Sequence, residues 1–412
     1  MMLAFAIPKA GDTYGKVMKV PKPLPLKPGF ALIRVLRAGV CNTDLEILKG
    51  YMGFHGVLGH EFVGIVQDVH TDGDEDDADA QGSSMIGQRV CGDINVGCSE
   101  CTVCCNAHNL DAACSKMSRN HCPNRTVLGI LNHHGTMAEY LTLPIRNLHV
   151  VPEHISDEDA VFAEPLAAAC RLVEQKLIHY NQNENDDQQQ QQQQQRPTDR
   201  VAILGDGKLG LMIAEVLGRE HMARCSSART KTTTSDTSSK SILPPPPVLF
   251  GKHPHKLDLV KDSGVDCQLV SECQDANAMN GVASQYANKY DVVVDATGSP
   301  AGLQLASGLC RPMGTLCLKS TCAAGEQFNA APFVIDELRV VGSRCGPIDE
   351  ALKLLALTDT PDNGDRDGTI KIKPLHVSKY ITKTFPLSQA DEAIKCAEEK
   401  STMKVQIICN EG

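Results

Sequence analysis

Short apolar runs, broken by Gly and Pro, fill the chain from residue 22 to about residue 69. Residues 30–36 and 62–66 each fit a strand, and residues 88–93 give a third strand signal. Between them, residues 71–80 hold six acidic side chains and no large apolar one, which indicates a solvated loop. The pattern therefore predicts that the chain opens with an all-β region.

The periodicity changes after residue 155. Residues 156–179 have helical spacing, with Ser156 as the N-cap, an acidic first turn, and Pro165 as the point where the helix breaks or restarts. A second helix fits residues 209–219. Continuous apolar runs typical of buried parallel strands lie at residues 200–204, 290–298 and 314–318. Strands alternate with helices here, which predicts an α/β fold with a doubly wound parallel sheet.

Two polar stretches interrupt this second region. Residues 181–196 include eight consecutive Gln, and residues 223–247 are rich in Thr, Ser and Pro. Neither stretch has enough apolar surface to form a core. We therefore expect disordered insertions at about residues 181–198 and 223–247.

Composition and charge narrow the class of protein. The chain has 412 residues, 42% of them hydrophobic and 22% charged, which predicts two soluble domains. A net charge of −10 argues against nucleic-acid or anionic-membrane partners. No apolar run reaches the roughly 20 residues of a membrane helix, and no signal peptide is evident, so we expect a cytoplasmic protein.

Six of the 18 cysteines lie within 25 residues. In a reducing compartment such a cluster favours metal ligation over disulfides. Cys98, Cys101 and Cys104 have two-residue spacing that suits a tetrahedral zinc with a closed, structural shell. Cys122 is the expected fourth ligand, although Cys105 and Cys114 compete with it, and unligated thiols are the alternative.

A second set of possible ligands is dispersed: Cys41, His60, Glu61 and Glu164. A thiolate, an imidazole and a carboxylate that leave one position open suit a catalytic zinc. By spacing alone, a buried cysteine and a core histidine explain Cys41 and His60 equally well.

A glycine turn follows the apolar run at 200–204 and precedes a helix. Gly205, Gly207 and Gly210 fit a dinucleotide fingerprint, in which the pyrophosphate rests on the helix N-terminus. We expect four further residues to join this cofactor site: Lys208, Leu209, Thr297 and Gly298. The next strand ends at residues 250–253 without a carboxylate, and Lys252 and His253 there favour the 2′-phosphate of NADP over NAD. An ordinary surface lysine is the alternative for Lys252.

Local sequence ties these motifs together. Residues 38–44 (AGVCNTD), 59–64 (GHEFVG), the cysteine cluster and residues 164–167 (EPLA) occur in the order found in the zinc-dependent medium-chain dehydrogenase/reductase family. The chain also resembles an alcohol-dehydrogenase-like branch of that family through CNTDLE, HCPNR and GDGKLG. The resemblance covers nearly the whole chain, apart from some ten extra residues between Cys104 and Cys122.

The resemblance implies roles for the dispersed residues. Cys41, His60 and Glu164 would hold a catalytic zinc, and Glu61 would lie beside it. Thr43 would relay the substrate proton, and Glu46 would take the place of a relay histidine, or else be a solvated helix residue. The resemblance also implies a GroES-like β-barrel catalytic domain from residues 1–168 and 323–412, and a Rossmann domain from residues 169–322.

The leading hypothesis is a zinc-dependent, NAD(P)-linked oxidoreductase that exchanges hydride with an alcohol or polyol, or with its aldehyde or ketone. By the same resemblance we expect a homodimer or homotetramer. A catalytically idle NADP-binding protein with a sensing or interaction role is one alternative, and a zinc-free quinone or enoyl reductase is another. Metal content separates the three.

Overall fold

Stretches from both ends of the chain build one unit of the structure, and the middle of the chain builds another. The structure is a computed structural model that describes residues 1–24, 26–70, 84–106, 119–180, 198–232, 245–270, 281–282, 284–320, 330–357 and 373–410. Unit 1 holds Met1–Ala167, Cys345–Leu357 and Leu375–Gly412, and unit 2 holds Ala168–Arg344 and Thr358–Pro374. Within the described ranges, no helix has both the length and the apolar character that crossing a bilayer requires.

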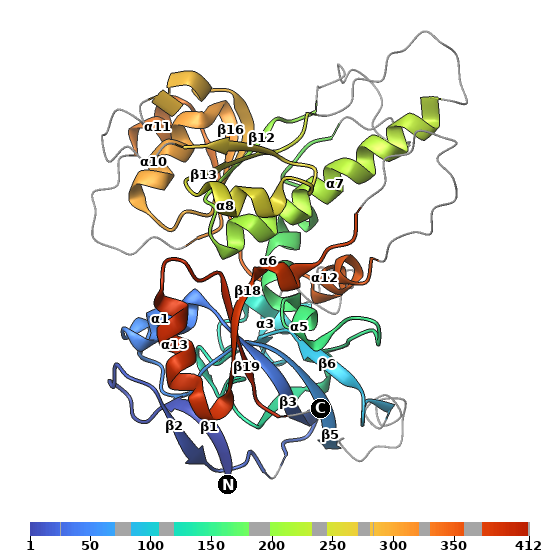
Figure 1. The fold of residues 1–412 in the computed structure, drawn as a ribbon, viewed down its shortest axis with the longest axis vertical. Coiled ribbons are helices and arrows are strands. Elements are labelled where there is room, and N and C mark those ends of the chain that lie inside the picture. The colour runs from blue at the N-terminus through green and yellow to red at the C-terminus, as the bar shows by residue number, and fades with distance from the viewer. Residues whose placement is uncertain are drawn as a thin grey trace. The chain divides into compact units, whose positions relative to one another are not determined.

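Unit 1 is built mainly of antiparallel strands (Figure 1). They are β1 (Met2–Ile7), β2 (Lys16–Val20), β3 (Phe30–Val40), β4 (Gly56–Val57), β5 (Glu61–His70), β6 (Arg89–Gly92), β7 (Asn95–Val96), β8 (Thr126–Leu128), β9 (Asn132–His133), β10 (Tyr140–Pro144), β11 (Leu148–Val150), β18 (Ile381–Pro386) and β19 (Lys404–Ile408). Its helices include α1 (Asn42–Leu48), α3 (Thr102–Asn106), α5 (Asp157–Ala160), α12 (Ile348–Leu355) and α13 (Ala390–Glu398). The predicted all-β opening is confirmed.

The long strand β3 organises this unit. In the seven-stranded sheet the order is β11-β6-β5-β3-β19-β18, and β10 also pairs with β3. β5 and β19 both run antiparallel to β3, so residues 61–70 and 404–408 flank the same strand. Ile33 and Val35 from β3 pack with Phe62 and Ile407 in one buried cluster. The last strand of the chain is therefore an interior part of the first unit.

Unit 2 contains the predicted parallel sheet. Its strands are β12 (Val201–Leu204), β13 (Val248–Gly251), β14 (Asp266–Leu269), β15 (Tyr290–Asp295), β16 (Cys310–Leu318) and β17 (Arg339–Gly342), in the order β14-β13-β12-β15-β16-β17. All the neighbouring pairs are parallel, and the order reverses at β12, as a doubly wound sheet requires. Its helices include α7 (Lys208–Thr232), α8 (Pro254–Leu257), α10 (Pro300–Leu309) and α11 (Ala331–Ile335).

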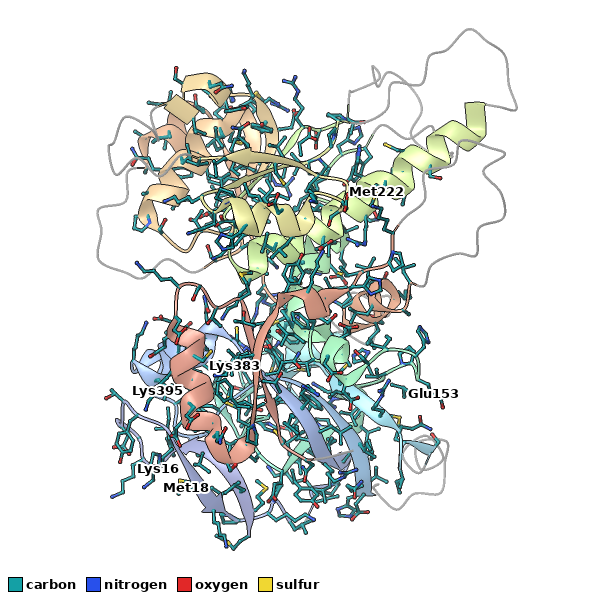
Figure 2. All side chains as sticks on the ribbon, in the orientation of Figure 1. Lys16, Met18, Glu153, Met222, Lys383 and Lys395 are labelled. Atoms are coloured by element: carbon teal, nitrogen blue, oxygen red, sulfur yellow. The ribbon has the colours of Figure 1, made fainter. Side chains whose placement is uncertain are left out.

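The prediction of a disordered insertion at residues 223–247 is wrong for its first ten residues, 223–232. α7 does not end near residue 219 but continues to Thr232, through the start of the stretch predicted to be disordered. Arg224 pairs with Glu220 one turn earlier, and its guanidinium lies 4.0 Å from the centre of the Tyr180 ring. Cys225 is buried. Side-chain contacts that a polarity count overlooks therefore stabilise the helix as far as Cys225 (Figure 2 labels Met222 on it).

Two further boundaries differ from expectation. The helical stretch predicted over residues 156–179 restarts near Pro165 as expected, and is divided into α5, capped by Ser156, and α6 (Ala163–Glu174), but it ends at Glu174 and not at residue 179. The return to unit 1 lies at Cys345 and not at residue 323, because β17 pairs with β16 and extends the parallel sheet. The predicted acidic loop and the glutamine stretch lie outside the described residues, as do residues 233–244.

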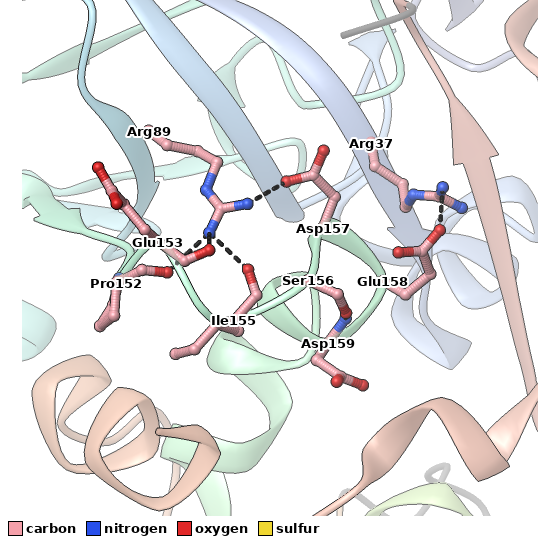
Figure 3. A network of polar contacts seen from close by, with 9 residues as sticks. All are labelled: Arg37, Arg89, Pro152, Glu153, Ile155, Ser156, Asp157, Glu158 and Asp159. Carbon is pink, nitrogen blue, oxygen red and sulfur yellow. Dashed lines mark hydrogen bonds and ion pairs between the residues drawn. The ribbon is translucent and has the colours of Figure 1, made fainter. Parts of the chain in front are cut away.

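A polar network fixes the loop that leads into α6. Arg89 donates to the Asp157 carboxylate at 2.9 Å and to the carbonyl oxygen of Pro152 at 2.7 Å (Figure 3). Arg37, from β3, pairs with Glu158 in the same network. These contacts attach residues 152–158 to β3 and β6, and so fix the segment that precedes α6 and Glu164.

Candidate metal and cofactor sites

Three of the dispersed residues converge in unit 1. The ligand atoms of Cys41, His60 and Glu61 all lie within 4.8 Å of one another. Cys41 follows β3 and is the N-cap of α1, His60 directly precedes β5, and Glu61 is its first residue. Antiparallel pairing of β3 with β5 brings these two points of the chain together.

Gly39 makes room for the carboxylate of this group. It pairs with Glu61 across the sheet, and a Cβ atom at Gly39 would overlap the Glu61 carboxylate and lie 2.9 Å from Val161 Cγ1. Any larger residue at this position would displace the acidic side chain.

Asp44 contacts backbone and side-chain atoms of this group. Its carboxylate accepts hydrogen bonds from the backbone N–H of Cys41 at 2.8 Å and of Gly59 at 3.1 Å. One of its oxygens also lies 3.5 Å from Nδ1 of His60. Burial lowers the pKa of His60, but the negative charges of Asp44 and Cys41 outweigh burial and raise this pKa well above its usual range. The fully buried Asp44 carboxylate thus fixes the positions of both Cys41 and His60.

Lys404 completes the surroundings of Glu61, and sequence reasoning missed it. Its ammonium group pairs with Oε2 of Glu61 across 343 positions of sequence, and the two side chains are only 6% and 1% exposed. Burial lowers the pKa of Lys404, but the Glu61 carboxylate outweighs burial and raises it. Register places Lys404 at the start of β19, beside β3, which no local motif indicates.

The buried atoms of the group fit a metal ion. Oε1 of Glu61 has no hydrogen-bond partner in the described structure although it is buried. Thiolate, imidazole and carboxylate at this separation form a mixed donor set that zinc accepts in catalytic sites. An unpaired carboxylate oxygen is costly in a protein interior, so a bound cation explains its position.

The other expected catalytic residues are placed differently. Thr43 lies in the first turn of α1, with its Oγ1 3.7 Å from Cys41 Sγ. Glu46 is exposed and pairs with Lys49 at 2.9 Å, as a solvated helix residue does. Glu164 lies in the first turn of α6, and among the described residues it is not part of the set within 4.8 Å. The structure therefore brings Thr43 to the group and leaves Glu46 in solvent, and the role of Glu164 as a ligand stays a prediction.

The cysteine cluster forms a second, separate group in unit 1. Cys98, Cys101, Cys104 and Cys122 have their sulfurs within 4.8 Å of one another. Backbone N–H groups of Cys98 and Cys101 donate to sulfurs of the cluster, each at 3.4 Å. Cys114 lies outside the described residues, and nothing is described of the Cys105 side chain. Four converging sulfurs with backbone donors suit a closed zinc site, with Cys122 as the fourth thiol.

The four thiols differ in acidity. Backbone N–H groups of Glu100 and Cys101 lower the pKa of Cys98 to about 6. Burial raises the pKa of Cys104 to about 12. Cys98 is therefore available as a thiolate at neutral pH, and the metal itself must favour deprotonation of Cys104.

The glycine turn of unit 2 has the expected strand–turn–helix setting. β12 ends at Leu204, Gly205 has φ of 108°, and α7 begins at Lys208 with Leu209 in its first turn. A Cβ at Gly205 would lie 2.8 Å from the Ala296 carbonyl oxygen, next to Thr297 and Gly298. Gly207 has open space around its Cα. The turn thus leaves its backbone accessible, as close approach of a pyrophosphate requires.

The end of β13 differs from expectation in one respect. β13 ends at Gly251, with Lys252 and His253 directly after it, as predicted. A carboxylate does lie there: Asp206, from the glycine turn, binds the backbone N–H groups of Lys252 and His253. Sequence reasoning considered only residues that follow the strand, and therefore missed it.

A cavity of about 390 Å³ lies in unit 1. His55, His133 and His134 line it, and its lining within the described chain includes no Asp, Glu, Lys or Arg. Burial lowers the pKa of His133 and of His134, so both rings are neutral at pH 7. His134 accepts a hydrogen bond from the Val57 N–H at 3.2 Å, so one wall of the cavity is attached to the segment that leads to His60.

Comparison with known proteins identifies the family of domains to which both parts of the chain are similar. Residues 27–153 match the alcohol dehydrogenase GroES-like domain, and residues 247–359 match the zinc-binding dehydrogenase domain. D-arabitol-phosphate dehydrogenase of Enterococcus avium is 24% identical over 92% of this chain and 90% of its own length. Erythritol/L-threitol dehydrogenase of Mycolicibacterium smegmatis is 26% identical over 93% and 91%.

A solved structure shows the same fold. A zinc-binding dehydrogenase of Sinorhizobium meliloti, bound to NADP, superimposes with a TM-score of 0.68 at 22% identity and covers 99% of both chains. With both domain matches in sequence order, the chain belongs to the zinc-dependent medium-chain dehydrogenase/reductase family. The predicted combination of a GroES-like domain and a Rossmann sheet is confirmed.

Proposed function

We propose that the protein is a zinc-dependent, NAD(P)-linked dehydrogenase that interconverts an alcohol or polyol and its aldehyde or ketone. The observation that carries this function is the convergence of Cys41, His60 and Glu61 around a buried, unpartnered carboxylate oxygen. Relatives named for polyol substrates support the substrate class.

Cys41 and His60 would hold the zinc, with Glu164 as a third ligand and Glu61 beside them. When bound, zinc supplies Lewis-acid polarisation of a C–O bond. Asp44 fixes the orientation of His60, and the Lys404 ammonium group pairs with the Glu61 carboxylate within the buried site. Thr43, whose Oγ1 lies beside Cys41 Sγ, would accept the proton of a substrate hydroxyl and pass it onward. Glu46 has no part in this proposal, because its side chain faces solvent.

The cofactor is held across the glycine turn from Gly205 to Gly210, with Thr297 and Gly298 near it. We take NADP as the preferred nucleotide, because Lys252 is exposed directly after β13 and offers a cation to a 2′-phosphate.

We further propose that the substrate enters the cavity in unit 1, one wall of which is joined to the segment before His60 by the His134–Val57 hydrogen bond, and that the cavity favours an uncharged substrate. Its neutral imidazoles can exchange hydrogen bonds with hydroxyl groups, but the described lining offers no fixed cation for a phosphate ester. A neutral polyol therefore fits it better than a polyol phosphate.

We also propose a homodimer in the cytoplasm. β17 lies at the edge of the parallel sheet, and Val334, Ile335 and Val340 nearby are at least 46% exposed. An apolar sheet edge of this kind is stabilised by pairing with a second copy. A reducing compartment would keep the cysteine ligands available. Light scattering of the purified protein tests the dimer.

The deciding experiment combines metal analysis with steady-state kinetics on a panel of polyols, their phosphates and both cofactors. We expect about two zinc ions per chain and turnover of neutral polyols that stops when the exchangeable zinc is removed. Cofactor binding without turnover of any substrate would favour the idle-protein alternative. Turnover that survives full removal of zinc would favour a zinc-free reductase.

A further inference from the structure

The carboxylate at the end of β13 does not come from the strand. Asp206 stands between Gly205 and Gly207, and its Oδ2 accepts hydrogen bonds from the backbone N–H of Lys252 at 2.8 Å and of His253 at 2.7 Å. Nδ1 of His253 lies 3.0 Å from the same oxygen. One oxygen of Asp206 thus takes every hydrogen bond that the described structure gives this side chain.

Packing fixes the position of Asp206. A Cβ atom at Gly251 would lie 2.8 Å from Asp206 Cβ and 2.7 Å from Leu257 Cδ2, so the glycine leaves space for the acidic side chain. Leu204 pairs with Phe250 in parallel register, which brings the glycine turn beside the end of β13. Only 7% of Asp206 is exposed. Its second oxygen, Oδ1, is free to accept a further hydrogen bond.

The Asp206 carboxylate lies where other dinucleotide-binding domains have an acidic residue from the second strand. In doubly wound dinucleotide domains an acidic residue at the end of the second strand accepts a hydrogen bond from the ribose 2′-hydroxyl and disfavours a 2′-phosphate. Here the strand ends in Gly251-Lys252-His253, and the glycine turn supplies the carboxylate. The backbone N–H groups of Lys252 and His253, which would otherwise suit a phosphate, are already occupied by Asp206.

Resting on the proposed dehydrogenase function, we propose that Asp206 is a specificity-determining residue of the nucleotide site. Its Oδ1 accepts a hydrogen bond from the adenosine ribose of NAD, and its charge opposes the 2′-phosphate of NADP. Lys252 acts in the opposite direction. The two side chains together keep the preference for NADP small, so that the site binds both nucleotides.

The test is binding of nucleotides to the full-length, zinc-loaded protein and to the variant Asp206→Asn. Kd values for NADH and NADPH come from fluorescence titration, and Kd values for ADP and 2′,5′-ADP, which lack nicotinamide, come from calorimetry. We expect Asp206→Asn to bind NADH and ADP about tenfold more weakly, and NADPH and 2′,5′-ADP more tightly. Asp258→Asn, an exposed residue of the same unit, removes the same charge and should leave the ratio unchanged.

A purely structural role for Asp206 predicts a different result. If Asp206 only anchors the loop, Asp206→Asn will weaken both nucleotides to the same extent, and that outcome would overturn the proposal. An unchanged ratio of the two Kd values would overturn it as well.

A second variant keeps the test valid if Asp206→Asn does not fold. Lys252→Gln leaves Asp206 in place and removes the opposing cation. We expect it to bind 2′,5′-ADP about tenfold more weakly than ADP, because the carboxylate then acts alone. Equal affinities for the two nucleotides would contradict a role for Asp206. Neither measurement depends on turnover, so failure of the proposed activity would be seen separately.

Discussion

The two metal-ligand groups of unit 1 differ in how far apart their residues lie in the sequence. Cys98, Cys101, Cys104 and Cys122 come from one stretch of 25 residues, and their own backbone N–H groups donate to their sulfurs. The group at Cys41 draws on β3, β5 and β19, and its buried ion pair joins residues 343 positions apart. The first site depends on a loop, whereas the second depends on the register of an entire sheet.

This contrast predicts how each site should fail. Loss of a thiol from the local cluster should affect the loop and leave the sheet intact. Loss of a residue that faces the metal should lower turnover. Loss of a residue that pairs with another buried side chain should lower the stability of unit 1.

The largest expected effect is on turnover. Replacing His60 by Ala should lower kcat/KM by about a thousandfold or more, because the imidazole is one of the proposed zinc ligands. Zinc content should fall from about two ions to about one, and cofactor affinity should stay within a fewfold of the unmodified protein. His70→Gln, at the far end of β5 from His60, is the matched control and should keep full activity. Normal turnover by His60→Ala would contradict the proposed site.

The next effect is on stability. Replacing Lys404 by Met leaves the Glu61 carboxylate buried without its cation, which should lower the free energy of unfolding by about 3–5 kcal/mol. Urea unfolding followed by circular dichroism measures it. The double variant Glu61→Gln/Lys404→Met should recover part of the loss, because no charge then stays unpaired. If the double variant is less stable than Lys404→Met, the ion pair is not the cause.

A smaller change is expected for the local cluster. Cys122→Ser should lose the tightly held zinc and lower stability by about 1–3 kcal/mol, while kcat/KM stays within a fewfold. Cys267→Ser, an exposed cysteine outside both groups, should retain both zinc ions. Loss of all turnover in Cys122→Ser would show that the two sites are coupled and not independent.

The smallest effect concerns thiol reactivity after metal removal. Because backbone donors lower the pKa of Cys98 to about 6, its alkylation should be close to maximal at pH 7 and should fall by half near pH 6. Cys104, with its pKa raised to about 12, should react far more slowly. Mass spectrometry of chelator-treated protein after brief exposure to iodoacetamide measures both. Zinc should protect both thiols, and equal reaction rates without zinc would contradict the assigned acidities.

Local spacing predicted the cysteine cluster and the glycine turn, because their residues are neighbours in sequence and the turn needs only backbone conformation. The strands and the parallel sheet followed from apolar runs such as residues 290–295. Cys41 and His60 needed the family resemblance in addition, since a lone cysteine and a lone histidine have no distinctive spacing. The placement of Glu164 as a zinc ligand stays a prediction.

Residues that act through partners far away in sequence were not predictable. Lys404 and Asp206 are ordinary charged residues until strand register places them beside Glu61 and His253. The extension of α7 has a similar cause, because Arg224 is stabilised by Glu220 and by the ring of Tyr180. Hydropathy patterns predict whether a side chain is buried or exposed, but not which distant side chain it will contact.

The position of β19 has a consequence for the order in which the chain folds during synthesis. β19 lies between β3 and β18, and Lys404 belongs to it, so unit 1 lacks an interior strand until all of unit 2 has left the ribosome. Unit 2 is nearly continuous in sequence and can fold first, whereas residues 37–40 of β3, which pair with β19, must wait unpaired on one side during that time. Until β19 arrives, Glu61 has no buried counter-ion, so the acidic side chain favours an open, hydrated sheet over a prematurely closed one.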